Sequence, residues 1–274
     1  MIEKNNDTFH FKSFSNLDSS PSADFLINSM DVMMKLSCIE TIKRRALKAM
    51  YLKSGDKVLE IGCGHGEDAE ILGKLVGRKG SVVAVDISHR MIEEAKKRSL
   101  QANVEYLTAD VTKLPYADHT FSACHADRFL VSCSDLKSSV KAILRLIKPG
   151  GTLCFTDVDA LSIVLAPYGR ITQIMLEALH KSFVNPYIGR ILPQIFIEQG
   201  LQNIVIIPEI SIIRSFDTLC KIFQFSILAE GAIKQGKLTP LEVKQWFEEL
   251  REAEEKGTFL YCIKLFTVLG SISL

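Results

Sequence analysis

The chain has 274 residues, with 33 lysines and arginines against 32 aspartates and glutamates, so its formal net charge is only +1. A chain of this length can form one large domain with a full hydrophobic core. Because phosphate binding needs a concentrated basic surface, the balanced charge argues against nucleic acid as the main partner.

The cysteines and the apolar segments indicate a cytoplasmic protein. Seven cysteines are scattered along the chain without a Cys-x-x-Cys pair, as is typical of reduced thiols. The first residues are polar and lack the apolar centre of a signal peptide. The apolar stretch 259–274 is interrupted by Lys264 and is too short for a membrane span, so it is interpreted as a central or nearly central strand.

The N-terminal region predicts a helical cap. Residues 1–23 read as an irregular segment pinned by Phe9, Phe11 and Phe14. From residue 24 to residue 50, apolar side chains recur at helical spacing and predict two helices. Four basic residues in this region are expected to form a solvated helix face: Lys43, Arg44, Arg45 and Lys48. We expect residues 1–50 to form a cap segment and residues 51–274 to form the main domain.

Strands and helices then alternate. Almost wholly apolar strands are predicted at 57–61, 81–86, 103–107, 120–126 and 151–157, and helices at 67–76, 89–100 and 135–147. Apolar strands separated by helices indicate a parallel sheet that is covered on both faces.

After Asp159 the alternation changes. Two helices are predicted over 160–200, a strand at 203–213, a helical pair over 216–255 and a last strand at 258–268. Two helices between the final strands exceed what a hairpin needs, so the segment at about 215–257 is expected to be an inserted lid.

A glycine-rich turn follows the first strand. Gly62, Gly64 and Gly66 alternate directly after an apolar run, where they let the backbone turn tightly and leave its peptide groups open to a ligand. Asp86 ends the second strand and follows Gly66 by 20 positions. This spacing is typical of a nucleoside-binding site in a doubly wound sheet.

Acidic residues mark the ends of the neighbouring strands. Glu60 lies at the end of the first strand, Asp110 just past the third, and Asp127-Arg128 just past the fourth. The carboxyl ends of parallel strands converge on one crevice. Asp86 is placed to accept hydrogen bonds from ribose hydroxyls and Asp110 from the exocyclic amine of a base, so the sequence predicts an adenosine site.

A nicotinamide dinucleotide is the alternative ligand. Glu67, however, occupies the position of the last glycine of the dinucleotide fingerprint, where a carboxylate would oppose a pyrophosphate. The chain also lacks a Tyr-x-x-x-Lys pair for proton relay. These features favour an adenosine-containing ligand without phosphates.

Several of these segments together resemble one family. They are 58–67, 83–88, 109–110, 114–116, 120–124 and 146–151. Over residues 45–160 the chain is similar to class I S-adenosylmethionine-dependent methyltransferases, and most similar to the small-molecule branch that includes ubiquinone and menaquinone biosynthesis enzymes. The resemblance implies a doubly wound, Rossmann-like α/β sheet of seven strands, six parallel and the last antiparallel, with helical cap elements.

The resemblance also assigns roles to individual residues. The residues implied to bind the cofactor are Glu60, Gly62 and Gly64 for its methionine end, Gly66 for the turn, Asp86 for the ribose, Ile87 and Met91 beside the adenine, Asp110 and Val111 for the adenine amine, and His125 beside the sulfonium methyl. No metal is implied.

The cofactor supplies the electrophile, so the protein must mainly align a nucleophile and exclude water. His125 is the candidate general base, and the further candidates are Asp127, Asp157, Asp159 and His180. The candidate substrate contacts are Arg128, which could orient an acidic substrate or pair with Asp127, and Tyr168, His180 and Tyr187. The stripe of Met30, Met33 and Met34 could line an apolar substrate pocket or belong to the core.

The expected function is O-, N- or C-methylation of a small organic acceptor, with S-adenosylhomocysteine as the product. Two alternatives stay open: methylation of a protein or RNA nucleophile, and cofactor binding without methyl transfer by a sensor or partner protein. A homodimer is also considered.

Overall fold

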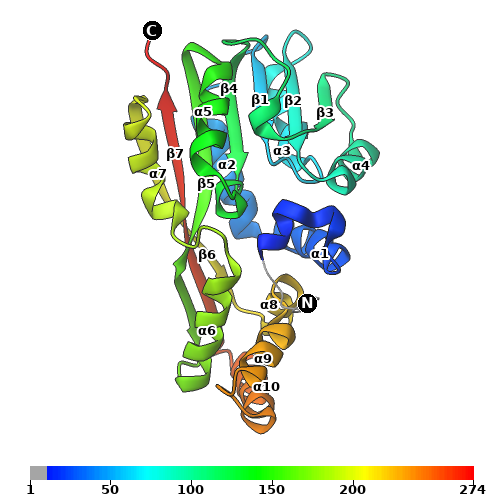
Figure 1. Cartoon of the computed structure of the whole chain (residues 1–274), viewed down its shortest axis with the longest axis vertical. Helices are drawn as coiled ribbons and strands as arrows, with labels where there is room; N and C mark the ends of the chain where they lie inside the picture. The colour runs from blue at the N-terminus through cyan, green and yellow to red at the C-terminus, as the bar shows by residue number, and fades with distance from the viewer. Residues whose placement is uncertain (1–10) are drawn as a thin grey trace, which may run out of the picture.

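A seven-stranded mixed sheet forms the centre of the molecule. The computed structural model describes residues 11–274. The strand order is β3-β2-β1-β4-β5-β7-β6 (Figure 1). The strands are β1 (Lys57–Ile61), β2 (Ser81–Asp86), β3 (Val104–Thr108), β4 (Phe121–Asp127), β5 (Ile147–Ala166), β6 (Gln202–Ile213) and β7 (Leu260–Ser271). Because β7 pairs antiparallel with both β5 and β6, six strands share one direction and the last opposes them, which confirms the expected fold class.

Helices cover both faces of the sheet. On one face, Leu47 of α2 (Ser37–Ala49) and Leu72 of α3 (Glu67–Val76) pack against Val58 of β1. On the other face, Leu59 belongs to a buried cluster that includes side chains of α5 (Leu136–Leu146) and α7 (Ile188–Glu198). Val58 and Leu59 are neighbours on one strand and point to opposite faces, so an unbroken apolar run is what a strand buried on both sides requires.

The fifth strand is longer than the sequence predicted. We expected helix from residue 160, but β5 continues to Ala166 and pairs with β7 as far as Leu260. A shift of register between Asp159 and Val164 interrupts the ladder, so the alternation of apolar and polar residues is broken there. The prediction of helix over 160–166 was therefore wrong, and α6 (Arg170–Ser182) begins only after this extension.

The C-terminal helices surround the extended strands. The helical pair predicted over 216–255 is three helices: α8 (Phe216–Ile222), α9 (Phe225–Lys234) and α10 (Pro240–Glu255). With α6 they gather around the ends of β5, β6 and β7, below the level of β1–β4 in Figure 1. Trp246 is buried among them and donates from Nε1 to Thr172 Oγ1 at 2.9 Å. The helices of this lower part therefore pack against one another through buried side chains. Strand β7 lies between β5 and β6, as expected of a central or nearly central strand.

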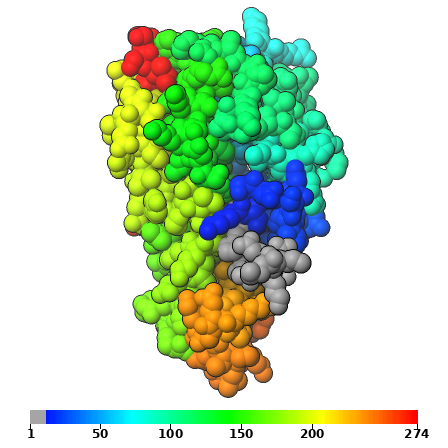
Figure 2. Space-filling model, viewed as in Figure 1, coloured from blue at the N-terminus to red at the C-terminus, as the bar shows by residue number. Residues whose placement is uncertain are grey.

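The N-terminal segment lies against the fourth helix. It comprises η1 (Phe11–Ser19), a 3-10 helix where an irregular segment was predicted, and α1 (Ala23–Met34). The carboxylate of Asp18 accepts hydrogen bonds from Ser88 Oγ at 2.6 Å and from the backbone N–H groups of His89 at 2.8 Å and Arg90 at 3.2 Å, at the start of α4 (His89–Arg98). Asp31 pairs with Arg98 at 2.6 Å. Figure 2 shows the segment, in blue, lying across one face of the molecule.

Two predictions about the ends of the chain are compared with residues 11–274 here. Phe9 of the predicted N-terminal segment lies outside residues 11–274. Within the described residues, no helix combines the length and apolar character that crossing a bilayer demands.

The Asp18 contact predicts a measurable anchor for the N-terminal segment. Asp18→Ala removes the acceptor at the N-terminus of α4, which typically lowers local stability by about 1 kcal/mol. We expect amide hydrogen exchange in residues 23–34 to become about fivefold faster in this variant. Glu252→Ala, which removes an exposed i,i+4 ion pair of α10, is the control and should leave this exchange unchanged. Equal exchange in Asp18→Ala and wild type would show that Asp18 does not hold the segment.

Candidate active site

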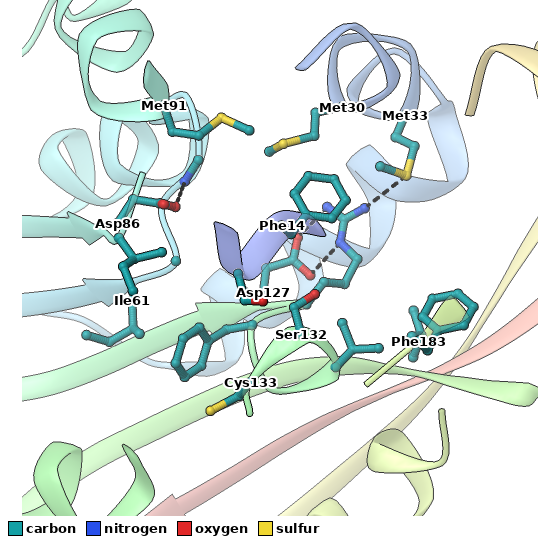
Figure 3. A pocket seen from close by; sticks show the side chains of 18 of the residues that line it. Phe14, Met30, Met33, Ile61, Asp86, Met91, Asp127, Ser132, Cys133 and Phe183 are labelled. Carbon is teal, nitrogen blue, oxygen red and sulfur yellow. Dashed lines mark hydrogen bonds and ion pairs between the residues drawn. The ribbon is translucent and has the colours of Figure 1, made fainter. Parts of the chain in front are cut away.

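A cavity of about 450 Å³ lies between the N-terminal segment and the carboxyl ends of the parallel strands. Figure 3 shows its extent, from Asp86 and Met91 on one side to Met33 and Phe183 on the other. The first side is bounded by the ends of β1 and β2. The second side is bounded by α1, β5, β6 and β7.

The glycine turn forms the floor of the first side. Gly62, Gly64 and Gly66 all have positive φ, at 67°, 53° and 86°. A Cβ atom on Gly62 would lie 3.1 Å from the ring of Phe129, and one on Gly64 would lie 2.5 Å from Cε of Met30. The positive φ favours glycine at both positions, and the Phe129 ring leaves little space for a Cβ at Gly62, so the backbone of the turn carries no side chains of its own there.

Asp86 connects this turn to the next strand and helix. Its Oδ2 accepts a hydrogen bond from Gly64 N at 3.0 Å and its Oδ1 accepts one from Ser88 N at 2.9 Å. Burial raises the pKa of Asp86, although these backbone N–H groups act in the opposite direction. A carboxylate oriented by two backbone donors can still accept further hydrogen bonds from a ligand.

Asp110 is fixed in a similar way. It precedes η2 (Val111–Lys113), and its Oδ1 accepts from Thr112 N at 2.9 Å and Thr112 Oγ1 at 2.8 Å. These hydrogen bonds lower the pKa of the carboxyl group. Asp110 is thus an ionised acceptor at the end of β3.

Seven of the ten residues predicted to bind the cofactor line this cavity. They are Gly62, Gly64, Asp86, Ile87, Met91, Asp110 and Val111. Glu60, Gly66 and His125 are not among the lining residues. Gly66 instead begins α3, where a Cβ would lie 2.7 Å from Tyr106 Oη. The structure therefore gathers most of the predicted set around one space.

Glu60 and His125 form a buried pair behind the glycine turn. The side chains lie on neighbouring strands in register, and His125 Nδ1 is 2.7 Å from Glu60 Oε2. Burial raises the pKa of Glu60 to about 7 against the influence of His125. Burial alone would lower the pKa of His125, but Glu60 outweighs it and raises the pKa to about 9. Each side chain is at most 2% exposed, so the pair is shielded from solvent.

A charge network that the sequence analysis missed lies beside this pair. Lys43 was expected on a solvated face, but its side chain is only 12% exposed. Its Nζ pairs with Asp68 and lies 3.1 Å from Asp127 Oδ2. The expectation was wrong for this residue. Lys43 follows Ile39 by four positions and precedes Ala46 by three, so the helical spacing already put it on the buried stripe.

Three residues of this network and of the buried pair lie close enough together to be considered as metal ligands. Glu60, Asp68 and His125 offer ligand atoms that all lie within 4.8 Å of one another. Lys43 is already paired with Asp68, and His125 with Glu60. Because the carboxylates have cationic partners within the chain, the cluster is compensated without a metal ion.

The second side of the cavity is mainly apolar. It includes side chains of α1, β5, β7 and the helices beyond them: Met33, Met34, Val158, Phe183, Phe223 and Leu265. Ile222 and Phe223 are the lining residues contributed by the segment expected to form a lid at about 215–257. We call this second side the apolar arm of the cavity. It depends on the extension of β5, which was not predicted from the sequence.

The predicted substrate and base residues are distributed differently. Arg128 and Asp127 line the cavity. Tyr168 is 74% exposed and Tyr187 is 46% exposed, and neither they nor His180 belong to the lining. Asp157 and Asp159 also lie outside it. Asp159 pairs with Arg190 at 2.8 Å.

Asp157, another candidate base, is surrounded by backbone N–H groups. It accepts hydrogen bonds from the backbone N–H groups of Leu130 at 2.8 Å, Val131 at 3.2 Å and Val158 at 3.0 Å. Burial raises the pKa of Asp157 to about 8. The side chain thus holds η3 (Leu130–Ser132) against β5.

The first side of the cavity fits the adenosine and methionine parts of a sulfonium cofactor. Asp86 and Asp110 offer oriented carboxylates, Ile87 and Met91 offer apolar contact, and the glycine turn offers bare peptide groups. Carboxylates on one side also suit a ligand with a positive charge. The residues that could hold the cofactor are thus present in one place.

Comparison with known proteins supports the same assignment. Residues 58–151 match a family described as "Methyltransferase domain". The chain is 25% identical to a ubiquinone/menaquinone biosynthesis C-methyltransferase of Cronobacter sakazakii, over 71% of this chain and 77% of the relative. It is 30% identical to a 2-phytyl-1,4-naphtoquinone methyltransferase of Nostoc punctiforme, over 53% of this chain and 61% of the relative.

Solved structures share the fold. The crystal structure of the YcgJ protein from a Bacillus species superposes with a TM-score of 0.59 at 18% identity, covering 86% of this chain and 99% of the other. The sheet order and the glycine turn agree with the matched family, so residues 58–151 form a methyltransferase domain of the class I S-adenosylmethionine-dependent type.

Proposed function

We propose that this methyltransferase methylates a ring carbon of a small, largely apolar acceptor, in the manner that the names of its quinone-methylating relatives describe. The observation that carries the proposal is the continuity of the cavity: its apolar arm opens directly onto the side that fits the cofactor. An apolar ring gains free energy when it leaves water for such a surface. A cavity of about 450 Å³ with a mainly apolar lining favours a small molecule over a protein or RNA nucleophile.

The chain contributes position and shelter. S-adenosylmethionine supplies an electrophilic methyl group when it is bound. Asp86 would hold the ribose hydroxyls, Asp110 would hold the adenine amine, and the backbone of the glycine turn would hold the methionine end. Phe14 and Met30, which lie at the cavity in Figure 3, would keep water from the reacting atoms.

We further propose that residues 11–34 act as a cap over this cavity. Phe14, Met30, Met33 and Met34 line the cavity from that side. The cap is anchored on α4 through Asp18 and Asp31, whose partners Ser88 and Arg98 belong to the same region as the cofactor-lining Met91. A homodimer and a cytoplasmic location stay predictions of the sequence.

His125 has a different role in this proposal from the one first expected. It is paired with Glu60 and is not among the residues that line the cavity, so it does not face a substrate proton. We propose that the pair holds the ends of β1 and β4 together and so positions the glycine turn. His125 is then a positioning residue and not the general base.

The proposed acceptor is tested with 1,4-dihydroxynaphthalene and S-adenosylmethionine, by release of S-adenosylhomocysteine and by locating the new methyl group with NMR. We expect methylation on a ring carbon. Phe183→Ala, which opens the apolar arm, should raise KM about tenfold without changing S-adenosylhomocysteine affinity, since burial of such a ring is worth about 1.5–3 kcal/mol. Leu100→Ala, at a residue that is 85% exposed, is the matched control. Methylation on oxygen alone, or none with this or a related ring, would contradict the proposal.

The Glu60–His125 pair predicts a pH-dependent stability. A folded-state pKa of about 9 for His125 means that its contribution is complete below pH 6.5 and is lost as the pH rises through 9. The pKa of Glu60 is also raised, to about 7, so its contribution to stability is lost as the pH rises through 7. We expect the free energy of unfolding in urea to fall by about 1–3 kcal/mol between pH 6.5 and pH 9.5.

The control is the uncharged pair Glu60→Gln/His125→Gln, in which this fall should largely disappear. An unchanged fall in the double variant would show that the pair is not its source. A loss of turnover in His125→Gln that exceeds its loss of cofactor affinity by 100-fold or more would restore His125 as a base, because a general base contributes about 10²–10⁴-fold.

A further inference from the structure

Arg128 presents one nitrogen to the cavity with a weak partner. Its Nε donates to Asp127 Oδ1 at 3.1 Å and its Nη2 donates to Asp127 Oδ2 at 2.7 Å. The other nitrogen, Nη1, donates to the thioether sulfur of Met33 at 3.6 Å, which Figure 3 marks with a dashed line at Met33. A thioether is a poor acceptor for a charged donor, whereas an anionic oxygen is among the best.

The guanidinium is held rigidly at this place. Arg128 follows β4 with a left-handed backbone, at a φ of 55°, and its N–H donates to Thr156 O on β5 at 2.7 Å. Its side chain is 17% exposed, and it lines the cavity beside Ser132 and Cys133. The bidentate contact with Asp127 fixes the plane of the guanidinium, so the direction of Nη1 is set before any ligand arrives.

The surrounding charges keep Arg128 ionised. Asp127 on β4, Asp68 on α3 and Asp157 on β5 face it, and Lys43 on α2 shares Asp127. Burial alone would lower the pKa of Arg128, but Asp127 outweighs it and raises the pKa. Lys43 Nζ also lies 3.1 Å from Asp127 Oδ2, so this carboxylate is shared between two cations.

The cavity offers no suitable proton acceptor among the side chains that the structure describes. Asp127 is bound to two cations, which lower its pKa against the effect of burial. Asp135 caps α5 through Ser138 N at 3.0 Å and has a lowered pKa. Burial raises the pKa values of Cys133 and Tyr261, so both are neutral acids. Asp86 and Asp110 are assigned to the adenosine.

The groups with pKa values nearer neutrality lie elsewhere. Glu60, His125 and Asp157 titrate at about 7, 9 and 8, but none of them lines the cavity. A neutral acceptor that had to lose a proton before attack would find no base beside it. An acceptor that arrives ionised would need none.

We propose that the acceptor enters as an oxyanion, a phenolate or the enolate of an acidic enol, and that its oxygen binds Nη1 of Arg128 in place of the Met33 sulfur. This inference rests on the proposed function, whose ring acceptor it specifies. Arg128 is then the residue that selects ionised over neutral rings. Met33 is the removable partner that occupies Nη1 until the acceptor arrives.

The charges and atoms balance without a protein base. The electron pair of the oxyanion, delocalised onto the ring carbon, forms the new bond to the methyl group. The pair of the broken sulfur–carbon bond stays on sulfur, so the positive sulfonium and the negative acceptor both become neutral. The methylated ring is then a neutral ketone, and solvent water converts it to the ring alcohol by taking the proton from the methylated carbon and returning one to the oxygen. A neutral product no longer has the charge that Arg128 binds, which favours its release.

The test uses two probes of nearly equal shape. 2-Hydroxy-1,4-naphthoquinone is an acidic enol that is ionised at neutral pH, and 2-methoxy-1,4-naphthoquinone is its neutral analogue. Binding of each is measured by calorimetry in the presence of saturating S-adenosylhomocysteine. We expect wild type to bind the ionised probe at least tenfold more tightly, in line with the strength of a charge-assisted hydrogen bond. Arg128→Gln should remove this preference.

A second pair of variants tests the site without removing Arg128, in case Arg128→Gln does not fold. Met33→Glu places a carboxylate at Nη1 and should weaken the ionised probe at least tenfold, while Met33→Gln should change it less than threefold. Arg170→Gln, at an exposed arginine on α6 that pairs with Glu242, is the control for loss of a positive charge. Affinity for S-adenosylhomocysteine is recorded for every variant and should stay within threefold of wild type.

The outcomes separate this inference from the function on which it rests. If wild type binds neither probe, the proposed ring acceptor is wrong and this inference falls with it. If both probes bind equally, or if Met33→Glu and Met33→Gln behave alike, the oxyanion site is wrong while the ring acceptor stands. A preference for the ionised probe that depends on Arg128 and is blocked by Met33→Glu supports the inference.

Discussion

The two backbone hydrogen bonds to Asp86 hold the site together. One comes from Gly64 in the glycine turn and the other from Ser88 at the start of α4, so a single carboxylate fixes the ends of two strands relative to each other. Ser88 then donates from Oγ to Asp18, which belongs to the N-terminal segment. A continuous series of hydrogen bonds thus runs from Asp86, the proposed ribose contact, to residues 11–34. Cofactor binding and closure of the cap are expected to support each other, because both act on this series.

Charge within the site is arranged in compensated groups. Glu60 is paired with His125, and Lys43 joins Asp68 to Asp127 and, through Asp127, to Arg128. Burying any one of these ions without a partner would be costly. The arrangement spans α2, α3, β1 and β4, so it couples α2 to the carboxyl end of β4. Nη1 of Arg128 is left with only the Met33 sulfur, a weak acceptor, as its partner. This is why we propose that the acceptor is anionic as well as apolar.

The cofactor side was more accessible to sequence reasoning than the acceptor side. Gly62, Gly64 and Asp86 are short-range features, because a strand end, a turn and a strand end follow each other closely along the chain. The extension of β5 depends on pairing with β7 about 100 residues later, across a register shift that breaks its alternation. Local patterns do not contain that information. The burial of Lys43 was present in the helical spacing, but the run of basic neighbours around it suggested a solvated face.

Binding of S-adenosylmethionine and S-adenosylhomocysteine, measured by calorimetry on the purified chain, tests the central claim most directly. We expect dissociation constants on the order of micromolar for wild type. Asp86→Ala should bind about tenfold more weakly or worse, because hydrogen bonds to a charged group contribute about 1.5–3 kcal/mol. Heat of binding for neither ligand with wild type, or equal affinity in wild type and Asp86→Ala, would contradict the account of this site.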